Sequence, residues 1–371
     1  MQTKKITLLS GDGIGPEVSL EAEKLLKVIE GQFNYKFEIT KKDFGGIAID
    51  KYGIPLPEDT LNTCKNSDAV LLAAIGGPKY DNLPREKRPE TGLLGLRAGL
   101  SAFANLRPVM VFDPLLDSST IKKDVLASTD LIVVRELTGG LYFGNPKGIE
   151  VKHGEKVGFN TMVYSESEIK RIAKVAFEIA RKRKKKVTSI DKANVLDVSQ
   201  LWRETVTQVS KDYKDVNLEH MLVDNAAMQL IKNPKQFDVI LAENLFGDIL
   251  SDEGAMLTGS IGMLPSASMG DGAHPAIYEP VHGSAPDIAG KNLANPIAML
   301  LSAAMMFKYS FSDEKVYNLI LNSVKNILSQ GYRTKDIHQE SRDGVSPTKL
   351  IGTREMGDLI CKELAVSKSK V

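Results

Sequence analysis

Hydrophobic runs alternate with segments of helical spacing from the beginning of the chain. The apolar positions of residues 6–9 predict a strand, which a glycine-rich turn at 11–16 ends before a helical pattern begins at residue 17. The next strand is expected at 37–39, and the apolar run 69–75, which stops at Gly-Gly-Pro, predicts a buried strand. This order of elements is typical of layered α/β proteins.

The same alternation continues in the middle of the chain. Strands are expected at 130–135, 187–190, 218–223 and 237–241, and helical periodicity between them is clearest at 166–182. We find no internal repeat, and no Pro/Ser-rich linker separates two halves. The pattern therefore predicts an α/β fold class.

Composition narrows the class of protein. The chain has 371 residues, 42% hydrophobic and 26% charged, as in an ordinary globular protein. The 48 basic and 47 acidic side chains nearly cancel, so we expect no strong positive field for nucleic acid. Cys64 and Cys361 provide no disulfide framework and favour a reducing compartment.

Neither a membrane span nor a targeting segment is expected. The longest nearly apolar stretch, 297–307, is shorter than the roughly 20 residues that a membrane helix needs. We recognise no secretory signal and no Arg/Ser-rich transit segment before Ile6. These features predict a soluble, cytoplasmic protein.

One run of positive charge stands out, at residues 181–186. It follows a predicted helix, where cations complement the helix dipole, and a solvated helix end is our interpretation. Contact with nucleic acid is the alternative, but no stacking aromatic residues or second basic cluster accompany the run.

The glycine turn after the first strand does not fit the Rossmann dinucleotide-binding motif. Gly11 and Gly13 have the spacing of the motif, but Gly15 comes one residue early, and Pro16 occupies the place of the third motif glycine. No acidic residue stands about 20 positions on at the end of a second strand. The turn predicts a tight strand-to-helix connection, and any nicotinamide cofactor would bind to a fold that is not Rossmann.

Three arginines have the chemistry to bind carboxylates. Arg97 shares a predicted helix with Leu93 and Leu94, Arg107 stands beside an expected chain breaker, Pro108, and Arg135 ends a predicted strand. Guanidinium groups bind carboxylates with two parallel hydrogen bonds, and the leucines suit a branched apolar tail. The alternative is that the leucines are core residues and the arginines form ordinary ion pairs.

Aspartates with metal-ligand spacing follow the strand expected at 237–241. Asp248 and Asp252 are four residues apart, so a helix places both carboxylates on one face, where their repulsion favours a bound cation. Oxygen ligands suit Mg²⁺ or Mn²⁺, and Asp224, which ends another predicted strand, is a candidate third ligand. A solvated acidic helix N-terminus is the alternative.

Five segments of the chain resemble motifs of the isocitrate/isopropylmalate dehydrogenase family of β-hydroxyacid oxidative decarboxylases, and occur in the order in which the family has them. They are most similar to its isopropylmalate branch. They are residues 11–17, 90–97, 191–196, 244–252 and 279–290, and the resemblance extends from Ile6 to about Ile360. Together they are far more specific than any one segment.

The resemblance implies a two-domain α/β fold with a mixed sheet, unlike Rossmann, in a homodimer with shared active sites. One domain, the NAD-binding domain, would combine residues 1–102 and 259–371. The other would be a central dimerisation and metal/substrate domain at 103–258, with the active site in the cleft between the two.

The resemblance also implies roles for individual residues. The catalytic residues would be Tyr142 and, across the dimer, Lys192. Substrate would be bound by Arg97, Arg107, Arg135, Glu90, Leu93 and Leu94, with the partner subunit's Val195 and the partner subunit's Asp224. The metal ligands would be Asp248 and Asp252 with the partner subunit's Asp224. NAD would contact Glu279, His282, Gly283, Ser284, Ala285, Asp287 and Asn295.

The expected reaction is NAD-dependent oxidative decarboxylation of 3-isopropylmalate to 4-methyl-2-oxopentanoate, a step of leucine biosynthesis. Asp287 suits the ribose hydroxyls of NAD and would repel the 2′-phosphate of NADP. Leu93 and Leu94 favour an apolar tail over the extra carboxylate of isocitrate. The alternatives are a family member that acts on homoisocitrate, tartrate or malate, and a catalytically silent homologue, which the intact Tyr142 and Lys192 argue against.

Overall fold

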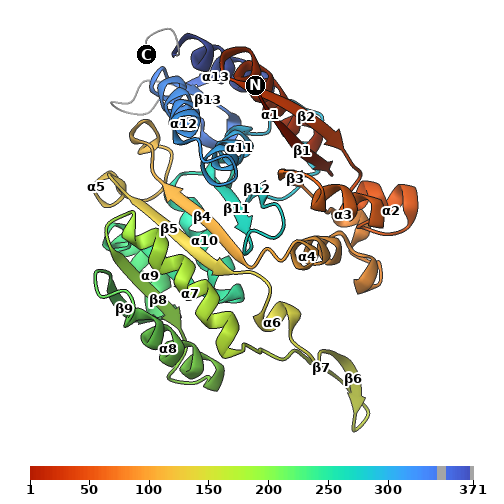
Figure 1. The fold of residues 1–371 in the computed structure, drawn as a ribbon, viewed down its shortest axis with the longest axis vertical. Helices are drawn as coiled ribbons and strands as arrows, with labels where there is room; N and C mark the ends of the chain where they lie inside the picture. Colours follow the sequence, from red (N-terminus) through yellow and green to blue (C-terminus); the bar gives the residue numbers. More distant parts are fainter. Residues whose placement is uncertain (341–347, 368–371) are drawn as a thin grey trace. The chain divides into compact units, whose positions relative to one another are not determined.

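Helices and strands alternate along the chain in the computed structural model, which describes residues 1–340 and 348–367 (Figure 1). Contacts divide these residues into two units. Unit 1 consists of 1–102, 111–123 and the chain from 255 onward, and unit 2 of 103–110 and 124–254. The domains predicted from the resemblance, 1–102 with 259–371 and 103–258, stay a prediction. The contact-based units differ from them in that residues 111–123 and 255–258 belong to unit 1.

Unit 1 is built on a mixed sheet of five strands in the order β2-β1-β3-β12-β11. The strands are β1 (Gln2–Gly11), β2 (Tyr35–Lys41), β3 (Ala69–Ala74), β11 (Pro265–Met269) and β12 (Ile277–Pro280). All neighbours are parallel except β11, which runs antiparallel to β12. Glycine turns, helices and loops therefore follow the carboxyl ends of β1, β2, β3 and β12 at one edge of the sheet.

The helices of unit 1 come from both ends of the chain. They are α1 (Gly15–Gln32), α2 (Gly46–Tyr52), α3 (Glu58–Lys65), α4 (Pro89–Gly99), α11 (Ile297–Tyr309), α12 (Glu314–Ser329) and α13 (Thr353–Ser367), with β13 (Tyr332–Arg333) paired to β14 (Lys349–Leu350). Every residue from Ile297 to Phe307 is buried. This apolar stretch is the core helix α11, and none of the described helices is long and apolar enough to cross a membrane.

The strands of unit 2 pair in the order β4-β5-β10-β8-β9, again with mixed directions. The strands are β4 (Ala104–Met110), β5 (Asp130–Glu136), β8 (Lys186–Asp191), β9 (Asn217–Leu222) and β10 (Val239–Ala242). β4 is antiparallel to β5, and the other pairs are parallel. The helices are α5 (Lys123–Leu126), α6 (Gly140–Phe143), α7 (Glu166–Arg181), α8 (Asp197–Ser210), α9 (Val223–Lys232) and α10 (Asn244–Leu257), and α10 continues into unit 1.

Amphipathic α7 shows how the sequence specifies a helix of unit 2. The Ser165 side chain accepts the amide of Glu168, whose carboxylate accepts the amide of Ser165, so a capping box starts the helix. Its buried positions, among them Ile169, Ala173 and Phe177, recur at helical spacing and face the sheet. The prediction of a helix at 166–182 is confirmed.

The predicted α/β fold class with a mixed sheet is confirmed, and each predicted strand exists within a few residues of its expected bounds. Two local expectations are wrong. Asp224 does not end a strand, because β9 stops at Leu222 and Asp224 lies in the first turn of α9. Pro108 does not break the chain after Arg107, since both residues lie inside β4. The hairpin of β6 (Gly148–Lys152) and β7 (Glu155–Phe159) was not predicted.

Candidate active site

The predicted polar residues of unit 2 gather where its parallel strands end. Arg135 is the next-to-last residue of β5, and Lys192 directly follows β8. Asp224 comes two residues after β9, and the Asp248/Asp252 pair lies in the helix that follows β10. Because the carboxyl ends of parallel strands meet at one edge of a sheet, the fold places these side chains on one side of unit 2.

Two buried arginines converge on the aspartates of α10. Arg135 is 2% exposed and donates from Nη1 to Oδ1 of Asp248 at 2.5 Å. Arg107 donates from Nη1 to Oγ of Ser251 at 2.7 Å, and the same nitrogen lies 3.3 Å from Oδ1 of both Asp248 and Asp252. Two cations therefore stabilise a pair of carboxylates that would otherwise repel each other.

The spacing argument for the aspartates is confirmed in its geometry: Asp248 and Asp252 lie on one helix. Desolvation raises the pKa of Asp252, the Arg107 charge opposes this rise, and the Asp248 charge adds to it. The Asp252 side chain is still 55% exposed, so it remains accessible to a ligand from solvent.

Tyr142 contacts the same acidic group. Its hydroxyl donates to Oδ2 of Asp248 at 2.9 Å, and its ring lies 5.8 Å from the guanidinium carbon of Arg135. Burial, followed by the negative charge of Asp248, raises the pKa of Tyr142 to about 12. The phenol therefore keeps its proton at neutral pH and is able to act as a proton donor.

Lys192 and Asp224 form a second pair. Lys192 Nζ lies 2.6 Å from Oδ1 of Asp224, and this hydrogen bond lowers the pKa of Asp224. Among the described residues, no three His, Cys, Asp or Glu side chains are close enough to hold a metal ion. Within one chain, then, Asp224 does not join Asp248 and Asp252, and the predicted three-carboxylate ligand set is not complete.

In unit 1, α4 carries the residues predicted to bind the substrate. Arg97 is buried and donates from Nη2 to Oε1 of Glu279 at 2.6 Å. Its Nε is also buried and has no hydrogen-bond partner among the described residues, which leaves a donor for an anion. Leu93 and Leu94, one turn earlier, are half-buried, and Glu90 is exposed. Val195, in unit 2, is 68% exposed.

The segment predicted to bind NAD begins within β12, at Glu279, and packs against the glycine turn. Ser284 donates from Oγ to the Gly76 carbonyl at 2.8 Å, and its own carbonyl accepts the Ile14 amide at 2.8 Å. A Cβ on Gly13, whose φ is +57°, would lie 2.0 Å from the Ser284 carbonyl oxygen. The glycine is therefore required by the close approach of this segment, a reason that the sequence pattern alone did not reveal.

Asp12, between Gly11 and Gly13, was missed by the sequence analysis. Its carboxylate accepts three backbone amides, from Gly46 at 2.7 Å, Ile47 at 2.8 Å and Gly76 at 2.7 Å. One side chain thus joins the turns that follow β1, β2 and β3. An acidic residue flanked by glycines in a strand-to-helix turn was the available signal.

The residues present fit a dinucleotide and a divalent cation. His282 Nε2 is buried without a partner among the described residues, while Nδ1 lies 2.9 Å from the Gly283 carbonyl oxygen. Burial lowers the pKa of His282, so the neutral ring offers one nitrogen to a ligand. Asp287 and Gly283 are exposed, and Ala285 is half-buried. For the cation, the carboxylates of Asp248 and Asp252 are hard oxygen donors.

Asn295 has a different environment from the other predicted NAD contacts. Its Oδ1 accepts the amide of Ile297 at 3.0 Å, and its Nδ2 lies 3.0 Å from Oδ2 of Asp336 and 3.4 Å from Sδ of Met263. Both donor positions of its amide are engaged within the protein. The side chain anchors the start of α11, and its contact with NAD remains a prediction.

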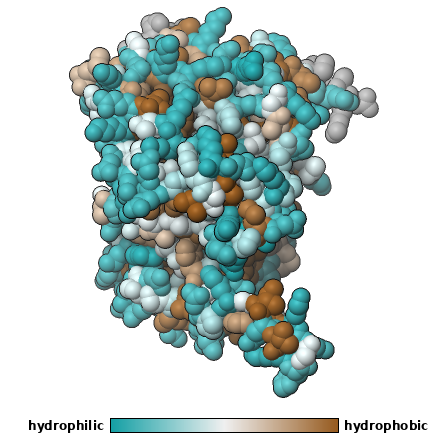
Figure 2. All heavy atoms as spheres, turned by 90° about the vertical axis from the view of Figure 1, so that its right-hand side faces the viewer, coloured by the Kyte–Doolittle hydropathy of each residue, from teal (hydrophilic) through white to brown (hydrophobic). Residues whose placement is uncertain are grey.

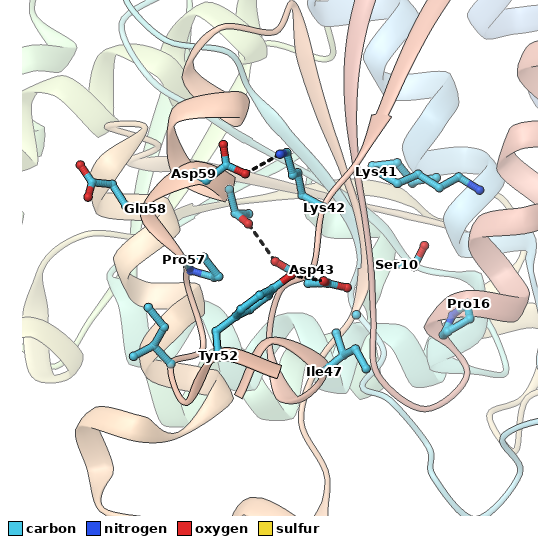
Figure 3. Close-up of a pocket in the computed structure, with 14 residues that line it drawn as sticks. Ser10, Pro16, Lys41, Lys42, Asp43, Ile47, Tyr52, Pro57, Glu58 and Asp59 are labelled. Carbon is cyan, nitrogen blue, oxygen red and sulfur yellow. Dashed lines mark hydrogen bonds and ion pairs between the residues drawn. The ribbon is translucent and has the colours of Figure 1, made fainter. Parts of the chain in front are cut away.

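A cavity in unit 1 lies apart from these residues. It has a volume of about 760 Å³ and opens between the first glycine turn and residues 41–60 (Figure 3). Several of its charged groups are paired: Lys42 with Asp59, and Asp43 with Lys51 and the Tyr52 hydroxyl. None of the predicted site residues lines it.

The basic run at 181–186 is engaged in ion pairs. Arg181 pairs with Asp215, Arg183 with Asp130 and Asp238, and Lys186 with Glu219. Its first residue ends α7 and its last begins β8, in agreement with the interpretation as a helix end.

Comparison with known proteins agrees with these features. The isocitrate/isopropylmalate dehydrogenase family profile matches residues 5–360. A 3-isopropylmalate dehydrogenase of Prochlorococcus marinus is 58% identical over 365 residues, 98% of this chain and 99% of that protein. The 3-isopropylmalate dehydrogenase of a Nostoc species is 58% identical over 367 residues, 99% of each chain.

Solved structures show the same architecture at lower sequence identity. An isocitrate dehydrogenase from Methylococcus capsulatus has a TM-score of 0.85 at 31% identity and covers 98% of this chain and 100% of its own. A β-decarboxylating dehydrogenase from Thermococcus kodakarensis has a TM-score of 0.77 at 32% identity, with 99% and 98% covered. The chain belongs to the isocitrate/isopropylmalate dehydrogenase family.

Proposed function

We propose that the chain catalyses the NAD-dependent oxidative decarboxylation of 3-isopropylmalate to 4-methyl-2-oxopentanoate, in leucine biosynthesis. Two relatives that are 58% identical to this chain over 99% of their own length are named 3-isopropylmalate dehydrogenase. The observation that carries the proposal is the cluster of Arg107, Arg135, Tyr142, Asp248 and Asp252 in unit 2. We further propose that the enzyme works in the cytoplasm, with which the two buried free thiols agree.

The arginines bind the malate carboxylates in this proposal. Arg107 and Arg135 are fixed by neutral partners, since Arg107 Nε donates to Asn105 at 2.7 Å and Arg135 donates to Asn244 at 2.7 and 3.0 Å. A prearranged guanidinium loses little side-chain entropy when the substrate binds. Arg97 supplies the third cation, and the adjacent Leu93 and Leu94 accept the isopropyl group.

Asp248 and Asp252 with the partner subunit's Asp224 would hold Mg²⁺ or Mn²⁺, and residues 279–287 with Asn295 would hold NAD. When bound, the cation withdraws electron density from the substrate oxygens and the cofactor accepts hydride. Glu90 and the partner subunit's Val195 would complete the wall around the isopropyl group.

Protons are moved by two side chains. The partner subunit's Lys192 receives the hydroxyl proton in its neutral amine form, and its hydrogen bond to the partner subunit's Asp224 keeps the amine oriented. After CO₂ leaves, Tyr142 donates its phenolic proton to the enol carbon. The short contact of Tyr142 with Asp248 places that proton among the carboxylate and guanidinium groups.

We propose a homodimer with shared active sites. Within one chain, Asp224 does not lie close enough to Asp248 and Asp252 to form a metal site with them. In this proposal a second chain supplies the third carboxylate.

Unit 2 also carries apolar side chains that are exposed to solvent in one chain. Met228 and Ile231 share a face of α9, and Ile249 lies on α10. The hairpin β6–β7 exposes Ile149, Val151 and Val157, and Figure 2 shows hydrophobic side chains on this hairpin. Surfaces of this kind are typical of an interface with a second copy.

The test is NADH formation with 3-isopropylmalate, isocitrate, homoisocitrate, tartrate and malate side by side, at fixed Mg²⁺ and NAD. We expect the highest kcat/KM with 3-isopropylmalate. One methylene in an apolar pocket is worth about 1–3 kcal/mol, so related alkylmalates should react slowly. A higher kcat/KM for isocitrate or malate would contradict the proposed substrate, and no NADH with any of the five would contradict the proposed enzyme class.

The Tyr142→Phe variant tests the proton donor. We expect kcat to fall by about 10²-fold or more while KM for 3-isopropylmalate changes little, because the phenol acts after substrate binding. An unchanged kcat, or a loss confined to KM, would contradict the role. Tyr213→Phe is a matched control, because Tyr213 stacks on Phe177 away from the candidate site.

A further inference from the structure

Asn244, the first residue of α10, is completely buried and uses every polar atom of its side chain. Oδ1 accepts two hydrogen bonds from Arg135, from Nη2 at 2.7 Å and Nε at 3.0 Å. Nδ2 donates to the carbonyl oxygens of Leu137 at 3.2 Å and Gly139 at 3.0 Å. Its backbone amide donates to the Tyr164 hydroxyl oxygen at 3.0 Å.

This set of partners permits only one orientation of the amide. Arg135 is a donor without acceptors, and the two carbonyl oxygens are acceptors without donors. Turning the amide over would place NH₂ against a guanidinium and oxygen against two carbonyl oxygens, so four hydrogen bonds would become four repulsions. Asn244 is therefore a rigid connection between β5 and the chain that follows it.

The two ends of this connection lead to two proposed functional groups. Asn244 binds the Nε/Nη2 edge of the Arg135 guanidinium. The remaining nitrogen, Nη1, donates to Asp248 at 2.5 Å. The carbonyls of Leu137 and Gly139 belong to the stretch that enters α6, where Tyr142 lies. Tyr142 donates to the other oxygen of Asp248 at 2.9 Å.

The amides of the short stretch before α6 have anchors of their own: the Leu137 amide donates to the Phe103 carbonyl oxygen at 2.8 Å, and the Gly140 amide to the Val163 carbonyl oxygen at 3.0 Å. The buried Glu136 carboxylate accepts the amides of Thr138 and Gly139, at 3.1 and 2.7 Å. Glu136 thus holds the amide side of the stretch, and Asn244 holds its carbonyl side. Loss of the Asn244 donors would leave two buried carbonyl oxygens without this partner and release the entry to α6.

We propose that Asn244 is a positioning residue, which sets Arg135 and Tyr142 on the two oxygens of Asp248 and so couples substrate binding to the final protonation. It touches no substrate, because it is completely buried. The inference rests on the proposed function, in which Arg135 binds a substrate carboxylate and Tyr142 donates the proton.

Two variants separate the two ends of the connection. Asn244→Asp keeps an acceptor for Arg135 and loses both donors to the carbonyl oxygens. We therefore expect KM for 3-isopropylmalate to stay within about threefold of the wild-type value and kcat to fall about tenfold or more. Asn244→Leu keeps the branching of the side chain and loses all four bonds, so KM should rise about tenfold as well.

A double-mutant cycle with Tyr142→Phe distinguishes positioning from general damage. In the Tyr142→Phe background, Asn244→Asp should lower kcat by less than about twofold, because the proton donor that it positions is already gone. If Asn244→Asp lowers kcat equally in both backgrounds, or if it changes only KM, the positioning role is overturned.

Asp238→Asn is the matched control for lost stability in unit 2. Asp238 is buried and accepts from Arg183 Nε at 2.8 Å and the Lys184 amide at 2.9 Å, away from the candidate site. We expect a lower Tm with unchanged kcat and KM, whereas Asn244→Asp should change kcat at temperatures well below its Tm. Equal kinetic losses in both variants would overturn the proposal.

The outcome for the wild-type protein separates the two claims. Absence of NADH formation with 3-isopropylmalate would reject the proposed function. Robust wild-type turnover together with independent losses in the Asn244 and Tyr142 variants would reject the positioning role alone.

Discussion

Arg97 and Glu279 form a buried ion pair in unit 1, with Nη2 of Arg97 2.6 Å from Oε1 of Glu279. Arg97 comes from α4 and Glu279 from β12, 182 residues apart in the sequence. The sequence analysis assigned the first to the substrate and the second to NAD. Arg97, which is proposed to bind the substrate, and Glu279, which begins the proposed NAD segment, therefore neutralise each other's charge.

Glu279→Gln tests the strength of this pair. Glutamine still accepts a hydrogen bond, but it leaves the buried guanidinium without a negative partner, and we expect a loss of about 1–3 kcal/mol in the free energy of unfolding. KM for 3-isopropylmalate should rise with it, because Arg97 loses its fixed position. Urea unfolding and steady-state kinetics measure the two effects. The control is Glu363→Gln, because the Glu363 carboxylate accepts an exposed hydrogen bond from Asn326. If both variants unfold at the same urea concentration as wild type, the ion pair does not stabilise the fold.

The pH dependence of stability contains a contribution from Tyr142. Its pKa of about 12 in the folded chain lies above the ordinary value of 10, so folding favours the neutral phenol. This contribution is fully present below pH 10 and is lost as the pH rises through about 12. Between these values wild type should lose more stability than Tyr142→Phe, as measured by urea midpoints. Parallel curves for the two proteins would contradict the shift.

The acidic pair on α10 predicts a requirement for a divalent cation. A chelator should abolish turnover, and added Mg²⁺ or Mn²⁺ should restore it. Asp252→Asn should raise the Mg²⁺ concentration for half-maximal activity about tenfold or more, since one hard charged ligand is lost. Glu253→Gln, next to Asp252 on the same helix, is the matched control and should keep the wild-type requirement. Full activity in excess chelator would exclude the metal role.

The glycine turn yields a prediction about cofactor affinity. Asp12→Asn offers one acceptor oxygen where three backbone amides are bonded, and it adds an NH₂ group that faces a donor. The turn that holds Ser284 should loosen, and KM for NAD should rise roughly fivefold or more while KM for 3-isopropylmalate changes less. Asp50→Asn, whose exposed carboxylate pairs with Lys79, is the control. Equal rises of both KM values would point to a general loss of folding instead.

The sequence was sufficient for elements whose burial is strong and periodic. The runs that became β3, β5, β8 and β10 are almost entirely buried, and helical spacing correctly placed Asp248 and Asp252 on one helix. The start of α9 was misplaced, because the apolar run of β9 continues through Val223 into the helix. The strands of the hairpin 148–159 gave little signal, since they are five residues long and face solvent in one chain.

Residues that act through distant backbone were out of reach of local patterns. Asp12 bonds amides 34, 35 and 64 positions away, and Asn244 bonds carbonyls 105 and 107 positions away. Their spacing carries no periodicity, because the contacts arise only when parallel strands bring their ends together. The motif glycines and the Asn-Leu-Phe-Gly-Asp segment marked these places without indicating what the side chains do.

Because Asp224 lies apart from Asp248 and Asp252 in one chain, two defective variants are expected to complement each other in a mixed dimer. Lys192 and Asp224 form one set, and the aspartates of α10 form another. If each centre takes one set from each subunit, a hybrid of an Asp224→Asn chain and an Asp252→Asn chain places both lesions in one centre and none in the other. At a Mg²⁺ concentration at which each variant alone turns over poorly, the two proteins, unfolded together and refolded as a mixture, should then complement each other and recover turnover.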